Sequence, residues 1–193
     1  MRKPISVWFA LSGLLLASVL ILANSPQDFT LKYAFKNADG SVFRLVHNYM
    51  ADGVKYRVDY LDPKGAANLI KIYRKDKGVY WSCNPTNKTY VESKLDETEW
   101  SYAMIGVFVW EEDKQKKTGE TEFLGRSCEV FATERAGFTT TLHLLQGTNL
   151  VLRSELREKE KLLQILETVE FQQEQPAASL FELPAGYKKV EGQ

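Results

Sequence analysis

Apolar and polar residues alternate with a period of two along most of the chain, and this pattern predicts β-strands. In the first such stretch the apolar residues occupy every second position, namely Phe29, Leu31, Tyr33 and Phe35. Turn signals such as Asp39-Gly40 and Asp52-Gly53 separate the stretches, so neighbouring strands are expected to pair antiparallel. We expect about ten strands, at about 29–36, 42–50, 54–60, 69–74, 79–83, 88–91, 120–124, 127–133, 138–146 and within 149–171.

The pattern changes to helical spacing after Asp96. Acidic residues there precede Trp100, Met104 and Val107, and acids in a first turn favour a helix. We predict a helix from about Asp96 to Ile105.

Residues 149–171 allow two interpretations. Their Leu, Glu, Lys and Gln content is typical of a helix, but apolar residues also alternate on both sides of the charged pair Lys159-Glu160. We favour a strand, a charged turn and a second strand. A sheet of about ten strands does not stay flat, so it curls into a barrel or half-barrel or splits into two packed layers.

Residues 1–25 are similar to an export signal. Arg2 and Lys3 precede an uncharged apolar run from Ile5 to Ala23. The run is longer than the usual core of about 7–15 residues and approaches the roughly 20 that span a bilayer. Two interpretations stay open, a cleaved signal peptide or a retained N-terminal membrane anchor. Under both, we expect residues 26–193 to form a single domain in the periplasm or cell envelope, and under the second the domain is anchored to the inner membrane.

Charge excludes one class of partner. The chain carries 25 basic and 25 acidic residues and no basic surplus, so nucleic-acid binding has no electrostatic support.

Cys83 and Cys128 are the only two cysteines. In an exported domain we expect them to form a disulfide, with two separate buried thiols as the alternative.

Motifs for catalysis or metal binding are missing from the sequence. His47 and His143 are the only histidines, and neither has a partner at metal-ligand spacing. There is no Gly-x-Ser-x-Gly motif and no glycine-rich phosphate loop. We therefore expect no catalytic residues, no metal and no cofactor, and we do not expect an enzyme.

Aromatic residues are the feature most open to a functional interpretation. Spread over several strands, they either fill a core or line an apolar cavity, since both need the same residue types. As cavity candidates, together with the helix residues, we take Tyr33, Phe35, Phe43, Tyr56, Tyr60, Trp81, Trp100, Met104 and Phe123.

The C-terminal segment Phe181-Glu182-Leu183-Pro184-Ala185-Gly186-Tyr187 resembles the closing motif of exported bacterial proteins similar to the periplasmic lipoprotein-sorting carriers. Pro184 and Gly186 are expected to end a short helix, while Phe181 and Leu183 fix the chain end on the sheet. The resemblance implies a mainly β (α+β) fold, a curved antiparallel half-barrel with one or two short helices on its concave side.

Carriers of that shape hold acyl chains, so the leading hypothesis is a non-catalytic envelope binding or carrier protein for a lipid, a lipoprotein acyl chain or another apolar ligand. The alternative is a membrane-anchored sensor or protein-interaction module of the same fold.

Overall fold

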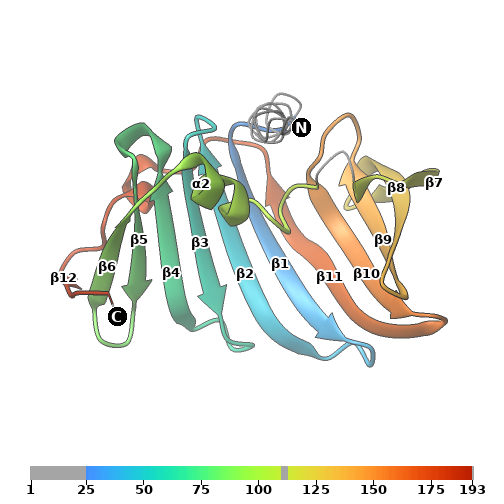
Figure 1. Ribbon diagram of the computed structural model, residues 1–193, viewed down its shortest axis with the longest axis horizontal. Coiled ribbons are helices and arrows are strands. Elements are labelled where there is room, and N and C mark those ends of the chain that lie inside the picture. The colour runs from blue at the N-terminus through green and yellow to red at the C-terminus, as the bar shows by residue number, and fades with distance from the viewer. Residues whose placement is uncertain (1–24, 110–112, 193) are drawn as a thin grey trace, which may run out of the picture.

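Antiparallel pairing of successive strands builds a single curled sheet (Figure 1). The computed structural model describes residues 25–109 and 113–192, and within them twelve strands pair in the order β12-β6-β5-β4-β3-β2-β1-β11-β10-β9-β8-β7. Among these strands, only β12 and β6 pair in parallel. The strands are β1 (Phe29–Asn37), β2 (Val42–Ala51), β3 (Lys55–Leu61), β4 (Ala67–Arg74), β5 (Val79–Asn84), β6 (Thr89–Lys94), β7 (Lys116–Phe123), β8 (Arg126–Arg135), β9 (Phe138–Leu145), β10 (Val151–Glu158), β11 (Lys161–Gln172) and β12 (Lys188–Lys189).

The mainly β half-barrel expected from the sequence is confirmed. The stretch 149–171 is the hairpin of β10 and β11, whose turn includes Lys159 at a φ of 53°. Twelve strands are present in the described part, where about ten were expected, and only β12 has no counterpart among the expected ranges. It contributes only two residues, too few to give an alternating pattern.

One α-helix, α2 (Glu97–Ala103), is described, together with the 3₁₀ turns η1 (Lys75–Lys77) and η3 (Ala178–Phe181). Asp96 caps α2, because its carboxylate accepts a hydrogen bond of 2.9 Å from the amide of Glu99. The helix ends before Ile105, and Gly106 then takes a φ of +88°. No helix among the described residues is long and apolar enough to cross a membrane. The expected export signal falls almost wholly in residues 1–24, outside the described part.

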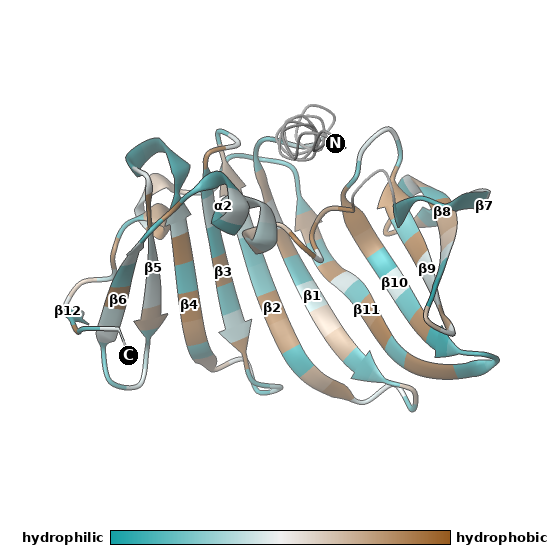
Figure 2. Ribbon diagram, viewed as in Figure 1, coloured by the Kyte–Doolittle hydropathy of each residue, from teal (hydrophilic) through white to brown (hydrophobic). Residues whose placement is uncertain are grey.

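Alternation along the strands gives the sheet two different faces, visible as bands of unlike hydropathy in Figure 2. The inner face carries the main core, which includes Phe29, Leu31, Tyr33 and Tyr56, and α2 packs on part of this face through Trp100. The outer face carries a smaller cluster over β4 and β5, which consists of Ala51, Ile70, Ile72, Trp81, Cys83 and Phe181.

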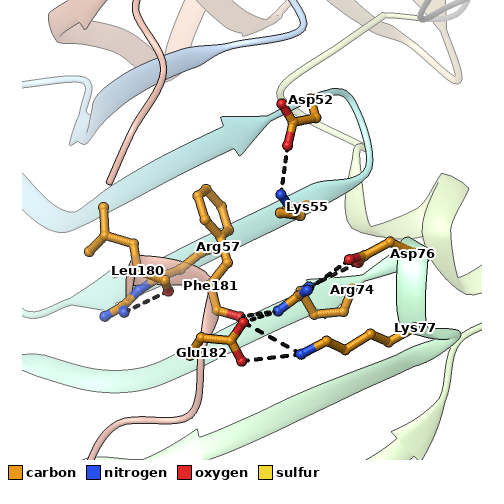
Figure 3. A network of polar contacts seen from close by, with 9 residues as sticks. All are labelled: Asp52, Lys55, Arg57, Arg74, Asp76, Lys77, Leu180, Phe181 and Glu182. Carbon is orange, nitrogen blue, oxygen red and sulfur yellow. Dashed lines mark hydrogen bonds and ion pairs between the residues drawn. The ribbon is translucent and has the colours of Figure 1, made fainter. Parts of the chain in front are cut away.

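The C-terminal segment covers the outer cluster (Figure 3). Phe181 in η3 is fully buried there, and Leu183 packs beside it. Two arginines of the sheet hold the segment by its carbonyl groups: Arg57 donates to the Leu180 oxygen at 3.1 Å and Arg74 to the Phe181 oxygen at 3.2 Å. The expected role of Phe181 and Leu183 in fixing the chain end is thus confirmed.

The expected disulfide is wrong for this structure, in which Cys83 and Cys128 are both free and buried. Cys83 lies in β5 within the outer cluster, whereas Cys128 lies in β8 within the main core. Seven strands separate β5 from β8 in the sheet. Sequence spacing does not report this separation, and two cysteines must have Cα atoms within about 7 Å to be bridged.

Phe181→Ala tests the C-terminal cover. Removing a fully buried ring should lower the free energy of unfolding by about 3–5 kcal/mol. Val190→Ala serves as the matched control, because Val190 is 42% exposed and lies further along the same segment. Equal urea midpoints for the two variants would show that the segment does not stabilise the sheet.

Thiol chemistry tests the separation of the cysteines. Burial raises the pKa of Cys83 to about 11, so little of this thiol is in the reactive thiolate form near neutral pH. We expect slow reaction with a thiol reagent in the folded protein and rapid labelling of both thiols after unfolding without reductant. If the unfolded protein were labelled only after a reductant was added, the two cysteines would be joined by a disulfide after all.

Candidate ligand pockets on the inner face

A short segment after α2 crosses the inner face, and we name Met104–Val109 the strap. Two backbone hydrogen bonds fix its far end to the start of β10: the Val109 amide donates to the Asn149 oxygen at 3.0 Å, and the Val151 amide donates to the Val107 oxygen at 2.9 Å. Phe108 packs edge-on against Phe29 of β1, with ring centroids 5.9 Å apart. The strap is therefore anchored both to β10 and to the floor of the sheet.

The first pocket lies between the strap and strands β1 to β3 and has a volume of about 270 Å³. Ala103, the last residue of α2, borders it on the helix side. Its lining is mostly apolar and consists of Tyr33, Phe35, Arg44, Val46, Asn48, Tyr56, Val58, Tyr60, Ala103, Ile105, Gly106, Val107 and Leu166.

The polar groups of the first pocket mostly bond to one another or to the backbone. Tyr56 donates to the Asn48 side-chain oxygen at 2.6 Å, Asn48 contacts the Leu31 carbonyl oxygen at 3.4 Å, and Tyr33 donates to the Val151 carbonyl. Burial raises the pKa of Tyr33 and of Tyr56 well above the ordinary value, so both are neutral phenols at neutral pH. The wall is thus uncharged except at Arg44.

The second pocket lies on the other side of the strap, over β8, β9 and β10, and has a volume of about 280 Å³. Its lining consists of Ile105, Gly106, Phe108, Val109, Asp113, Thr133, Arg135, Thr140, Leu142, Val151, Ser154 and Leu166. The two pockets share Ile105 and Gly106 of the strap and Leu166 of β11. The strap therefore divides one apolar hollow into two chambers of nearly equal size.

Four of the aromatic residues chosen from the sequence line the first pocket: Tyr33, Phe35, Tyr56 and Tyr60. Trp100 and Met104 are buried in the main core at the α2 end, above the sheet.

Like Trp100 and Met104, three further chosen residues line neither pocket. Phe43 is 40% exposed and touches the Phe35 ring, with centroids 6.1 Å apart. Phe123 ends β7 and packs against the main core. Trp81 requires a correction, because it lies in the outer cluster beneath the C-terminal segment.

The sequence reasoning missed the second pocket and the residues that join the two. Leu166 alternates in a strand like many other leucines, so its period of two indicates a face but not a central position. Gly106 follows the predicted helix directly, and a glycine there is the one sequence signal for the sharp change of direction.

The histidines take no part in the pockets. His47 lies in β2 and His143 in β9, with three strands between. Burial lowers the pKa of each ring, which favours neutral imidazole. No group of three His, Cys, Asp or Glu side chains in the described ranges is placed to hold a metal ion.

Solved structures share this fold at low sequence identity. A conserved protein from Thermus thermophilus has a TM-score of 0.60 and 16% identity over 95% of this chain and 99% of its own. MucB of Pseudomonas aeruginosa, solved in complex with MucA, has a TM-score of 0.56 and 19% identity over 87% of this chain. This chain spans only 60% of that MucB chain.

A putative outer membrane lipoprotein-sorting protein domain from Vibrio parahaemolyticus is 15% identical, but its TM-score of 0.31 carries no argument about the fold. No protein-family model and no curated protein sequence matches the chain. The comparisons therefore establish the half-barrel fold, and the resemblance of the C-terminal motif to the lipoprotein-sorting carriers stays a prediction.

Proposed function

We propose that this domain binds an apolar ligand, such as a lipid or a lipoprotein acyl chain, in the inner-face pockets, and that it works as a non-catalytic binding or carrier protein of the periplasm or envelope. The observation that carries the proposal is the pair of mostly apolar chambers beneath α2 and the strap. Water against apolar walls is unfavourable by about 25 cal/mol per Å², so a ligand that covers these walls gains that free energy.

The chemistry of the first pocket's wall supports binding over catalysis. The titratable groups deepest in the first pocket are tyrosines, and burial moves their pKa away from neutrality. A general base needs a pKa near the working pH, so these phenols are unsuited to that task. They are suited to packing, because a phenol ring offers a large apolar surface and a single hydroxyl that the wall itself satisfies.

Ile105→Asp tests the proposal with little risk to the fold. Ile105 is 56% exposed and borders both pockets, so the variant places a carboxylate at both. We expect affinity for a fluorescent fatty acid to fall by roughly tenfold or more, about 1.4 kcal/mol. Leu124→Asp, at a residue that is 50% exposed and lines neither pocket, should bind as the unmodified protein does.

Native mass spectrometry of the purified protein adds an independent reading. Co-purifying lipid is the expected result. No co-purifying lipid together with no fatty-acid binding would rule out a carrier of apolar molecules.

A second candidate function is a protein-interaction module or sensor anchored by residues 1–25. The observation that favours it is the similarity in fold to MucB, which is solved bound to MucA. A half-barrel that receives a partner protein on its inner face would serve an envelope sensor.

Site-specific photo-crosslinking in cells separates the second function from a free carrier. A crosslinker in place of Tyr102, which is 63% exposed on α2, should give one discrete protein adduct if the inner face receives a partner. Val190 at the C-terminal end provides the matched control position. Identical adducts at both positions, or none at either, would exclude a partner on this face.

A further inference from the structure

The two chambers are matched in size, and each is small. Their volumes of about 270 and 280 Å³ both fall just under the range of about 300–1,000 Å³ that is usual for ligand pockets, and the two together lie within it. The two chambers together therefore accommodate a single ligand of ordinary size better than either chamber does alone.

The strap determines what shape such a ligand has. Val107 and Phe108 are buried in the main core, so this part of the strap rests on the sheet. Gly106 presents no side chain to either chamber, and Ile105 is exposed. A molecule with two apolar arms fits, with one arm on each side of the strap and the arms joined outside.

Both chambers extend toward the same ends of the strands. We name this side of the sheet the open edge and define it by the turns 38–41 and 136–137. Registers place these turns at one edge, because Asn37 of β1 pairs with Gln164 of β11, while Glu158 of β10 pairs with both Lys161 and Phe138. In Figure 1 this edge lies at the bottom, opposite α2.

Each chamber has an arginine at its open-edge end. Arg44 of β2 lines the first chamber and pairs across the sheet with Phe35. Arg135 of β8 lines the second and pairs with Phe138, which is exposed. Both ends therefore have an aromatic ring beside a guanidinium group, and the lining of the second chamber also includes the carboxylate of Asp113.

These two arginines differ from the others in the described part of the chain. Within it, neither forms an ion pair or lies over an aromatic ring, whereas the other five do one or the other. Arg57, Arg74, Arg153 and Arg157 bind carboxylates, and Arg126 lies over the Phe171 ring. Two such positive charges at the ends of two apolar chambers favour a ligand whose head group is an anion.

We propose, building on the function above, that the ligand is a two-chain amphiphile with an anionic head group. One chain occupies each chamber, the chains straddle Ile105 and Gly106, and the head group lies at the open edge, between the strand ends that carry Arg44 and Arg135.

Matched lipids test the proposal on the delipidated, unmodified protein. Native mass spectrometry should show one phosphatidylglycerol with two chains per protein, and up to two molecules of lysophosphatidylglycerol, which has a single chain. Phosphatidylcholine with the same chains should bind about tenfold more weakly, a difference of about 1.4 kcal/mol. If each protein bound at most one lysophosphatidylglycerol and no phosphatidylglycerol, the two-chain assignment would be overturned. Equal affinity for phosphatidylcholine would overturn the anionic one.

A pair of filling variants tests the chambers one at a time. Ala103 lines only the first chamber and Thr140 only the second. Ala103→Phe and Thr140→Phe should each reduce the number of bound lysophosphatidylglycerol molecules from two to one. Each should also weaken the affinity for the two-chain lipid by at least about tenfold. If either variant binds the two-chain lipid unchanged, the ligand uses a single chamber. Absence of every apolar ligand, including the fatty acid, would instead contradict the proposed function itself.

Charge variants complete the design. Arg44→Gln and Arg135→Gln should weaken phosphatidylglycerol several-fold each and leave phosphatidylcholine unchanged. Arg157→Gln is the control, since Arg157 already pairs with Glu155 at 3.0 Å. The same loss in all three would assign the effect to net charge and remove the role of Arg44 and Arg135.

Discussion

The inner face depends on the attachment of the strap to β10. A single curled sheet exposes one apolar face over its whole width, and α2, with seven residues, is too short to cover it. The hydrogen bonds of Val107 and Val109 to the 149–151 segment extend that cover to the other half of the sheet, and Phe108 packs it onto Phe29. Without this attachment α2 would cover only the β2 and β3 side, and the hollow would not be divided.

The apolar cluster on the outer face is also covered, in this case by the C-terminal segment, which charge-assisted hydrogen bonds hold in place. Arg57 is held by two hydrogen bonds to Asp59 and Arg74 by two to Asp76, so both guanidinium groups are fixed before they meet the C-terminal segment. Each then uses a remaining N–H group on a backbone carbonyl of that segment. Phe181 is thereby directed into the outer cluster, and a buried apolar contact and a polar clamp stabilise each other.

Local patterns predict the elements of this fold well and their faces less well. Period-two alternation found the strands and the hairpin in 149–171, because each strand needs only its own residues to show the pattern. It did not show which face Trp81 occupies, since in this sheet both faces carry apolar clusters. The role of Trp81 was misassigned for that reason, and the disulfide was misassigned because sequence spacing does not report the seven strands between β5 and β8. The site was likewise predictable only where it follows from strand alternation, as for Tyr33 and Tyr56. The second chamber was missed, because it is created by the strap, whose course is set by contacts with residues about 40 positions away, at 149–151.

Small residues decide that the space beneath the strap stays open. Ala103 and Gly106 stand where large side chains would fill the first chamber or its border with the second, and a Cβ added at Gly106 would meet no atom within 4 Å. The tyrosine wall is rigid by contrast, since Tyr56, Tyr73 and Tyr80 stack with centroids 5.7 and 5.3 Å apart. Collapse would therefore have to move the strap, and its anchors at Val107, Phe108 and Val109 oppose that. An apolar hollow held open between a rigid floor and an anchored cover is stabilised most by a ligand that fills it.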